Sequence, residues 1–233
     1  MRRLLWWVLV VVLLAVPCGA VAQRSPPETG TAGVLAPPLA DGFAYVERFD
    51  GTDPATVFDG LLTVGHDAPW TGTLTGEHYR MENLASPGAA RYFYLMALPG
   101  GGAGGTLSQG TVQVDVAIVE VHPGAIVVGA GLVFDVDPDR GHYLAFVVTD
   151  EGYALFVRDS DGLNEAMSGT SGAVVPGGTN RLTVRTSGSE TVLEINGDHV
   201  AGIDFGRPPA GGVGIVALGA GTFAFTDFAY ASP

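Results

Sequence analysis

The chain has 233 residues, of which 47% are hydrophobic and only 15% charged, and it contains 35 glycines and 15 prolines. This composition argues against general disorder, and a chain of this length can bury a sizeable core. Acids outnumber bases by 24 to 11, every base is an arginine, and the formal net charge is −13. Such an acidic chain repels phosphate backbones and anionic membrane surfaces, so nucleic acid is not an expected partner.

The N-terminus has the three parts of a secretory signal peptide. Arg2-Arg3 is followed by the apolar run Leu4–Val16 and by the small residues Ala20-Val21-Ala22. The run is shorter than the roughly 20 residues that a helix needs to span a bilayer, so an uncleaved anchor is the less favoured alternative. We therefore expect cleavage of residues 1–22, export to the periplasm or the extracellular space, and no transmembrane helix in the mature chain.

The only cysteine, Cys18, lies inside the segment to be removed. The mature chain would then have no disulfide, no zinc–thiolate site and no cysteine nucleophile. A lipidated Cys18 is the rival interpretation, but bacterial lipoprotein signals resemble Leu-Ala-Gly-Cys, whereas Pro17 precedes the cysteine here. We therefore expect a protein without a lipid anchor.

The rest of the chain divides at residue 43. Residues 23–42 contain two Pro-Pro pairs among Gly, Ser and Thr, which is the composition of a semi-extended linker. From there onward short apolar stretches alternate with turn residues, and no long helical periodicity is present, which predicts an all-β domain over 43–233. The expected strands are 43–49, 61–65, 77–83, 91–97, 111–121, 125–135, 142–148, 153–158, 181–186, 191–195, 199–204, 212–217 and 223–230. The segment 99–105, PGGGAGG, predicts a flexible loop.

One hairpin can be predicted in detail. The segment Thr149–Tyr153 suits a three-residue loop that ends in a left-handed Gly152 and places its first and last residues opposite each other. In that register Phe146, Phe156 and Arg158 share the face opposite the presumed core. This face predicts either an exposed aromatic platform for a ligand or a surface that another segment covers.

A second hairpin is indicated by Asn196-Gly197, the strongest short-range signal for a two-residue turn. It pairs 191–195 with 198–203 and puts Leu193 opposite Val200.

A series of short motifs then follows in a characteristic order. The motifs are Gly76-Glu77-His78-Tyr79-Arg80-Met81, Gly131-Leu132-Val133-Phe134, His142-Tyr143-Leu144-Ala145-Phe146, Gly152-Tyr153-Ala154-Leu155, Asn180-Arg181-Leu182-Thr183-Val184, Leu193-Glu194-Ile195-Asn196-Gly197, Gly212-Val213-Gly214-Ile215 and Phe225-Thr226-Asp227-Phe228. Over about residues 43–230 this order resembles the concanavalin A-like (laminin-G-like) jelly-roll superfamily. The resemblance implies two curved antiparallel sheets, with any ligand on the concave face or the rim loops, and it favours carbohydrate recognition.

Glycosidases of this superfamily carry a motif resembling Glu-x-Asp-x-x-Glu, whose outer carboxylates must lie about 5 Å apart. In the nearest segment Gln113 or Val114 occupies the position of the first Glu. Asp115 and Glu120 would point to opposite faces of an unbroken strand, and both are expected to face solvent. The chain also has no G-x-S-x-G elbow. We therefore expect a non-catalytic protein, with a hydrolase that uses unrecognised carboxylates as the alternative.

Calcium is the one cofactor that the sequence suggests. Asp135, Asp137 and Asp139 alternate along the chain, and hard oxygen ligands at such positions suit Ca²⁺. The same residues also suit an ordinary tight turn, and an EF-hand would have Glu where Phe146 stands. The similar string Asp159–Glu165 predicts a polar loop, and the five histidines have no spacing typical of a metal site.

Trp70 is the only tryptophan after residue 22, in a loop flanked by Pro and Gly. It could stack on a sugar ring or close one end of the sandwich. The sequence thus predicts an exported two-sheet jelly roll that binds carbohydrate, with Trp70, Asp135, Phe146, Phe156 and Arg158 as candidate ligand contacts. A purely structural or adhesion domain is the further alternative, because this fold hosts many functions.

Overall fold

The computed structural model describes residues 43–50, 62, 64–95 and 107–231, all of which belong to one compact unit. The expected signal peptide, the linker and the loop at 99–105 lie outside the described residues. Every regular element in the described ranges is a β-strand. Within these ranges no helix is long and apolar enough to cross a membrane.

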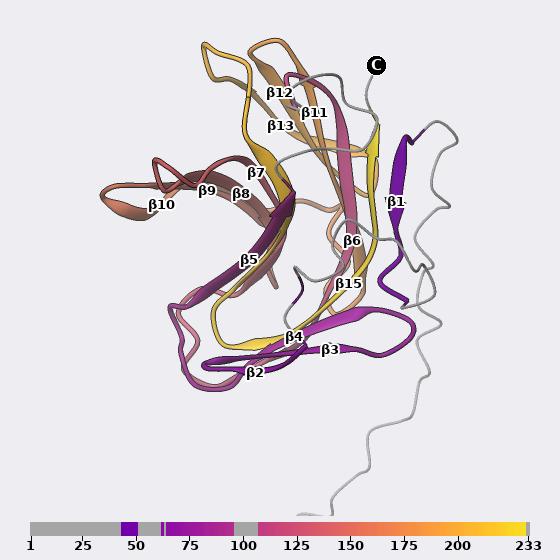
Figure 1. Ribbon diagram of the computed structural model, residues 1–233, viewed down its shortest axis with the longest axis vertical. Helices are drawn as coiled ribbons and strands as arrows, with labels where there is room; N and C mark the ends of the chain where they lie inside the picture. Colours follow the sequence, from indigo (N-terminus) through magenta and orange to yellow (C-terminus); the bar gives the residue numbers. More distant parts are fainter. Residues whose placement is uncertain (1–42, 51–61, 63, 96–106, 232–233) are drawn as a thin grey trace, which may run out of the picture. The chain divides into compact units, whose positions relative to one another are not determined.

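The strands form two antiparallel sheets of a jelly-roll sandwich (Figure 1). Sheet A has the order β13 (Asp198–Asp204), β12 (Glu190–Ile195), β11 (Thr179–Ser187), β6 (Gln109–Val121), β15 (Gly221–Ala231), β4 (Tyr79–Asn83), β3 (Trp70–Leu74) and β2 (Gly65–Asp67), and β1 (Tyr45–Glu47) pairs with the end of β15. Sheet B has the order β10 (Gly162–Gly169), β9 (Tyr153–Asp159), β8 (His142–Val148), β7 (Gly129–Asp137), β14 (Gly212–Leu218) and β5 (Ala90–Leu95). The chain crosses between the sheets several times, and some neighbours, such as β6 and β15 or β5 and β14, are far apart in sequence, so their pairing depends on long-range contacts.

The core lies between the two sheets and follows the two-residue period of the strands. Sheet A contributes Val112, Val114 and Val116 from β6 and Phe223 and Phe225 from β15, and sheet B contributes Leu132, Phe134, Phe146 and Ile215. All of these side chains are completely buried. Removal of this apolar area from water, at about 25 cal/mol per Å², is the main force that holds the sheets together.

Two strands, β3 and β10, lie wholly outside the ranges that the sequence predicts, and the range 61–65 shares only Gly65 with β2. β3 was taken for a loop around its tryptophan. The polar loop expected after Asp159 is instead β10, an edge strand with no buried residue, in which exposed and partly buried residues are equal in number. Because an edge strand of this kind buries neither face completely, it lacks the apolar alternation by which strands are recognised.

The predicted register of the β8–β9 hairpin is wrong by one residue. Val148, not Thr149, pairs with Tyr153. The N–H of Thr149 donates to the carbonyl of Gly152 at 2.8 Å, and the N–H of Gly152 donates to Thr149 Oγ1 at 3.0 Å, which closes a shorter loop. Gly152 is not left-handed; a Cβ there would lie 2.1 Å from the carbonyl oxygen of Gly169, so the close approach of the β10 end requires a glycine.

This slip moves alternate side chains to the other face of the sheet. Phe146 points into the core, where it is completely buried. Phe156 and Arg158 lie on the opposite face, because they pair with Ala145 and Tyr143 respectively. The predicted surface of Phe146, Phe156 and Arg158 therefore does not exist as one face.

The second hairpin has the predicted turn. Asn196 and Gly197 are both left-handed, with φ of 54° and 88°. A β-bulge next to Leu193 shifts the register, so that Leu193 pairs with Ala201 rather than Val200. The turn is thus confirmed and the pairing beyond the bulge was predicted wrongly.

Candidate functional site

Sheet B has an apolar face on the side away from the core, which we call the outer face of sheet B. The strand register aligns two rows of residues across all six strands. One row is Tyr94, Gly214, Val133, Ala145, Phe156 and Glu165, and the other is Tyr92, Val216, Gly131, Val147, Ala154 and Ser168. Directly opposed residues of neighbouring strands lie on the same side of a sheet, so each row runs across this one face.

Three tyrosines converge on the outer face of sheet B. The rings of Tyr92 and Tyr94, both on β5, have centroids 5.9 Å apart, and the rings of Tyr92 and Tyr143 have centroids 4.7 Å apart. Because β14 and β7 lie between β5 and β8, a flat sheet would hold these strands about 14 Å apart. The twist of a sheet brings two diagonal corners of one face together, and the rings meet along that diagonal. The outer face of sheet B is therefore concave.

The tyrosines differ in how far they are open to solvent. Val133, Ala145 and Val216 on this face are completely buried, although they do not face the main core. Tyr143 belongs to the same cluster and is 5% exposed. Tyr92 is 36% exposed and therefore offers part of its ring to a ligand.

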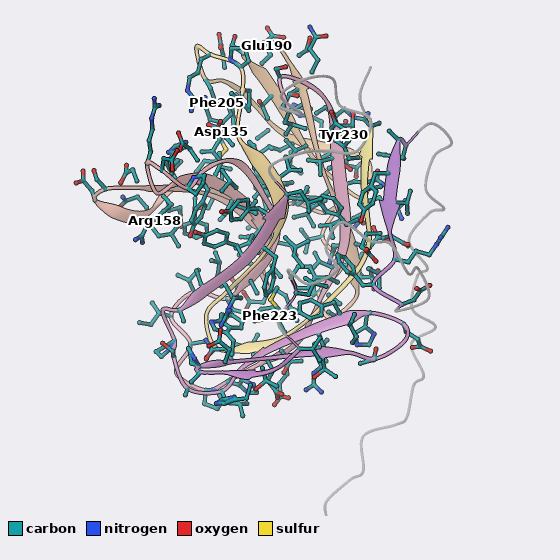
Figure 2. The ribbon with its side chains drawn as sticks, in the orientation of Figure 1. Asp135, Arg158, Glu190, Phe205, Phe223 and Tyr230 are labelled. Carbon is teal, nitrogen blue, oxygen red and sulfur yellow. The ribbon has the colours of Figure 1, made fainter. Side chains whose placement is uncertain are left out.

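Arg158 lies beside this aromatic cluster. It pairs with Tyr143 across the β8–β9 ladder and is exposed. Figure 2 shows it at the β9–β10 side of sheet B, away from the core residue Phe223. The pKa of the Tyr143 phenol is raised mainly by burial and further by Tyr92, and the charge of Arg158 acts in the opposite direction. The Arg158 guanidinium and the Tyr92 phenol are therefore both close enough to Tyr143 to affect its ionisation.

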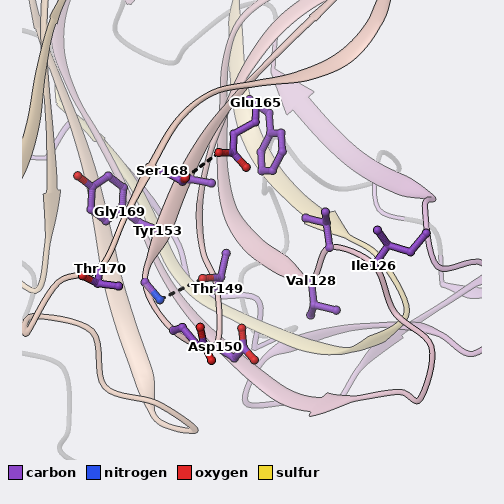
Figure 3. Close-up of a pocket in the computed structure, with 14 residues that line it drawn as sticks. Ile126, Val128, Thr149, Asp150, Tyr153, Glu165, Ser168, Gly169 and Thr170 are labelled. Carbon is purple, nitrogen blue, oxygen red and sulfur yellow. Dashed lines mark hydrogen bonds between the residues drawn. The ribbon is translucent and has the colours of Figure 1, made fainter.

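A hollow of about 370 Å³ opens at the hairpin end of the outer face (Figure 3). It is lined by Phe156 and by polar side chains, among them Thr149, Glu165 and Ser168. Ser168 Oγ donates a hydrogen bond to Glu165 Oε1 at 2.6 Å. An apolar ring with a few polar groups around it is the usual chemistry of a site for a small polar ligand such as a sugar.

A second hollow, of about 640 Å³, lies at the opposite end of sheet B and contains the predicted aspartate string. Asp135 is left-handed, at φ of 52°, and only 5% exposed. Its carboxylate accepts hydrogen bonds from Arg207 and from the N–H of Ala210, at 2.8 Å for the latter, and lies 3.2 Å from His142 Nε2. Burial opposes ionisation, but these hydrogen bonds and the charge of Arg207 outweigh it, so the pKa of Asp135 is lowered.

The other two aspartates of the string shape a turn. Asp137 Oδ1 accepts hydrogen bonds from the N–H groups of Asp139 and Arg140, at 3.1 and 3.2 Å. Asp135 is committed to Arg207, and in the described ranges no three His, Cys, Asp or Glu side chains gather as a metal site. Calcium binding at this string stays a prediction from the sequence.

The carboxylates of β6 are arranged differently from the prediction. A β-bulge places Glu120 opposite Thr222 while Asp115 stays opposite Thr226, so both carboxylates lie on the same face of sheet A. They are about 13 Å apart along the strand, too far for a glycosidase pair. The solvent-facing position expected for Asp115 is also wrong, because this residue is 2% exposed.

Asp115 has a structural partner instead. Arg181 Nε and Nη2 donate to its two carboxylate oxygens at 2.6 and 2.7 Å. Burial raises the pKa of Asp115 in spite of this arginine. The pair therefore joins β6 to β11 and offers no free nucleophile.

The structure brings only some of the predicted contacts together. Phe156 and Arg158 share the outer face of sheet B, and Asp135 lies in the second hollow. Trp70 is 4% exposed and packs on Phe223, with ring centroids 6.2 Å apart. Like Phe146, it belongs to the buried core and is not a surface contact for a ligand. The tyrosines were not predicted as contacts; two of them alternate with Phe93 in the short strand β5, which is the available sequence signal.

No model of a protein family and no curated protein matches the sequence. Several solved structures match the fold. The carbohydrate-binding module CBM66 from Bacillus subtilis is 15% identical with a TM-score of 0.53, over 71% of this chain and 92% of that one. The β-glucanase of Bacillus licheniformis is 10% identical with a TM-score of 0.53, over 83% of this chain and 100% of that one. A Bacillus subtilis protein with a galectin-like fold is 11% identical with a TM-score of 0.51, over 70% and 86%.

These likenesses confirm the concanavalin A-like jelly-roll fold that the sequence motifs predict. At such low identity they bear on the fold alone, so any function must be argued from the surfaces of this chain.

Proposed function

We propose that the protein is an exported, non-catalytic carbohydrate-binding module whose binding site is the outer face of sheet B. The observation that carries this proposal is the convergence of three tyrosine rings on a concave surface, with Tyr92 partly open to solvent. The C–H faces of sugar rings pack on aromatic rings, and their hydroxyls need a few fixed polar partners. The hydrogen-bonded pair of Ser168 and Glu165 supplies such partners on the same face.

The comparison with CBM66, which its name describes as a carbohydrate-binding module, supports this proposal at the level of the fold. The chemistry of the β6 carboxylates supports the non-catalytic part. Asp115 is held by Arg181, and its distance from Glu120 does not suit a displacement at a sugar carbon.

A thermal-shift screen of the purified protein against a polysaccharide panel tests the proposal, with calcium and with a chelator in parallel. A ligand that binds only the folded state raises the melting temperature by mass action. We expect at least one polysaccharide to do so, and Tyr92→Ala to remove the shift. Leu84→Ala is the matched control, because Leu84 is also exposed but belongs to no element of sheet B. A flat response across the panel, with a well-folded protein, would contradict the proposal.

Export rests on the N-terminal sequence. Fractionation of the producing cells should place the protein outside the cytoplasm, and N-terminal sequencing of the mature form should begin at Gln23. A mature form that retains Met1 in the cytoplasm would overturn this part of the proposal.

A second candidate function is hydrolysis of a glycan in the hollow of about 370 Å³. The observation that favours it is that three carboxylates, those of Asp150, Glu151 and Glu165, line this one hollow. The test is release of reducing ends from any polysaccharide that binds. Release of reducing ends by the wild type that is lost in Glu165→Gln would establish the protein as a hydrolase. Binding of the polysaccharide without release of reducing ends would favour the non-catalytic binding module.

A further inference from the structure

Most of the arginines that the structure describes form ion pairs with carboxylates. Six of the eight described arginines form ion pairs, namely Arg80 with Glu82, Arg91 with Asp67, Arg140 with Asp137, Arg181 with Asp115, Arg185 with Glu194 and Arg207 with Asp135. Of the arginines in the described ranges, Arg48 and Arg158 have no such pair. Acids outnumber bases by 24 to 11, and an arginine without a carboxylate partner is an exception among the described arginines.

The position of Arg158 makes this exception informative. It stands on the outer face of sheet B between Tyr143 and Leu163, its register partners on β8 and β10. It is exposed, as expected for a charge that can meet a ligand. Arg48 follows β1, which pairs with β15 of sheet A, and so lies away from the tyrosine cluster.

We infer that the outer face of sheet B binds an acidic sugar residue and that Arg158 contacts its anionic group, a carboxylate or a sulfate. This inference rests on the proposed function and names the ligand class. The planar guanidinium can donate two parallel hydrogen bonds to a carboxylate or a sulfate, as arginines do when they bind carboxylates and phosphates. The partly exposed ring of Tyr92 would pack on the sugar ring at the same time.

The remaining charges around the site are consistent with this arrangement. Three carboxylates, those of Glu165, Asp150 and Glu151, line the hollow at the hairpin end of this face, and Glu165 Oε1 accepts a hydrogen bond from the hydroxyl of Ser168. Arg158 lies two residues beyond Phe156 along β9, away from the hairpin. The net charge of −13 repels an anionic polymer at long range, but salt screens charges beyond about 8 Å at physiological ionic strength. Only an anionic group in direct contact with Arg158 therefore gains from binding, so the selectivity depends on local geometry.

Matched pairs of polymers test this inference by titration calorimetry with the purified protein. Alginate and polygalacturonate are each compared with their carboxyl-reduced forms, and dextran sulfate is compared with dextran. We expect at least one acidic polymer to bind about tenfold or more tightly than its neutral partner, the change that about 1.4 kcal/mol of differential binding produces. The pair that shows the preference identifies carboxylate or sulfate as the group recognised.

Two variants separate the role of Arg158 from that of net charge. Arg158→Gln should abolish the preference for the acidic polymer, while Arg48→Gln, which removes the same charge elsewhere, should keep it. Both variants should melt close to the wild type because both side chains are exposed.

The outcomes distinguish this inference from the proposed function. Two results would overturn the acidic-sugar inference: equal binding of acidic and neutral polymers, or a preference that survives Arg158→Gln. If Tyr92→Ala still removes binding in either case, the proposed function stands. Binding of none of the six polymers would overturn the inference as well. If the wider polysaccharide panel is also silent, the proposed function fails with it.

Discussion

The ring of Tyr92 on β5 lies 4.7 Å from the ring of Tyr143 on β8, although β14 and β7 separate the two strands in sheet B. This contact bridges the concave outer face of sheet B. It also places a partly exposed ring next to an almost buried one, so the two tyrosines should respond differently to substitution.

Tyr143→Ala should destabilise the protein, because it removes a ring that is 5% exposed. Truncation of a buried aromatic side chain costs about 3–5 kcal/mol, and urea unfolding monitored by circular dichroism measures it. Tyr92→Ala should cost much less, because its ring is 36% exposed. Equal losses for the two variants would contradict the described difference in burial.

Asp135 should make stability depend on pH on the acid side. Its pKa is lowered in the folded protein, so its contribution is present above the unfolded pKa, about 3.9, and is lost as pH falls through the folded pKa. Asp135→Asn should cost about 1 kcal/mol at pH 7, because it removes the charged partner of Arg207, whose side chain is half exposed and can be solvated. The free-energy gap between wild type and variant should shrink below pH 4. A gap that stays constant from pH 7 to pH 3 would disagree with this assignment.

The buried pair of Asp115 and Arg181 should show strong coupling in a double-mutant cycle. Loss of either partner leaves the other charge in a site where Asp115 is 2% exposed, at a cost of about 3–5 kcal/mol. We therefore expect Asp115→Leu and Arg181→Leu to be far from additive, with the double variant more stable than their sum predicts. Additive effects would show that the pair does not hold β6 to β11.

Gly152 should tolerate no side chain. A Cβ at this position would lie 2.1 Å from the carbonyl oxygen of Gly169, so Gly152→Ala must push the ends of β9 and β10 apart. Gly172→Ala is the control, because nothing lies within 4 Å of a Cβ there. The melting temperature should fall for the first variant and hold for the second. A neutral Gly152→Ala would show that the hairpin packs less closely than described.

The sequence predicts this fold well because most strands alternate apolar and polar residues or are continuous apolar runs between turn residues. The range 142–148 agrees with β8 residue for residue. The site was predicted less well for a specific physical reason. A one-residue difference in the β8–β9 loop reverses which residues of β8 face the core, so that Phe146 points inward while Phe156 and Arg158 stay on the outer face. The loop is fixed by the Thr149 hydroxyl and by contact with Gly169, which pattern analysis does not see.

Two other features could not be read from the sequence. The bulge in β6 brings Asp115 and Glu120 to one face, whereas an ideal strand of that length would oppose them. The tyrosine cluster depends on the twist of sheet B, which joins side chains of β5 and β8 that are about 50 residues apart in the chain. Both arise from the geometry of the assembled sheets and not from local patterns.

The most direct test of the central claim is an NMR titration of the isotope-labelled protein with an oligosaccharide of a polysaccharide that binds. The account predicts chemical-shift changes in amides of β5, β8 and β9, centred on Tyr92, Tyr143 and Arg158. Changes confined to sheet A, with these amides unaffected, would contradict a binding site on the outer face of sheet B.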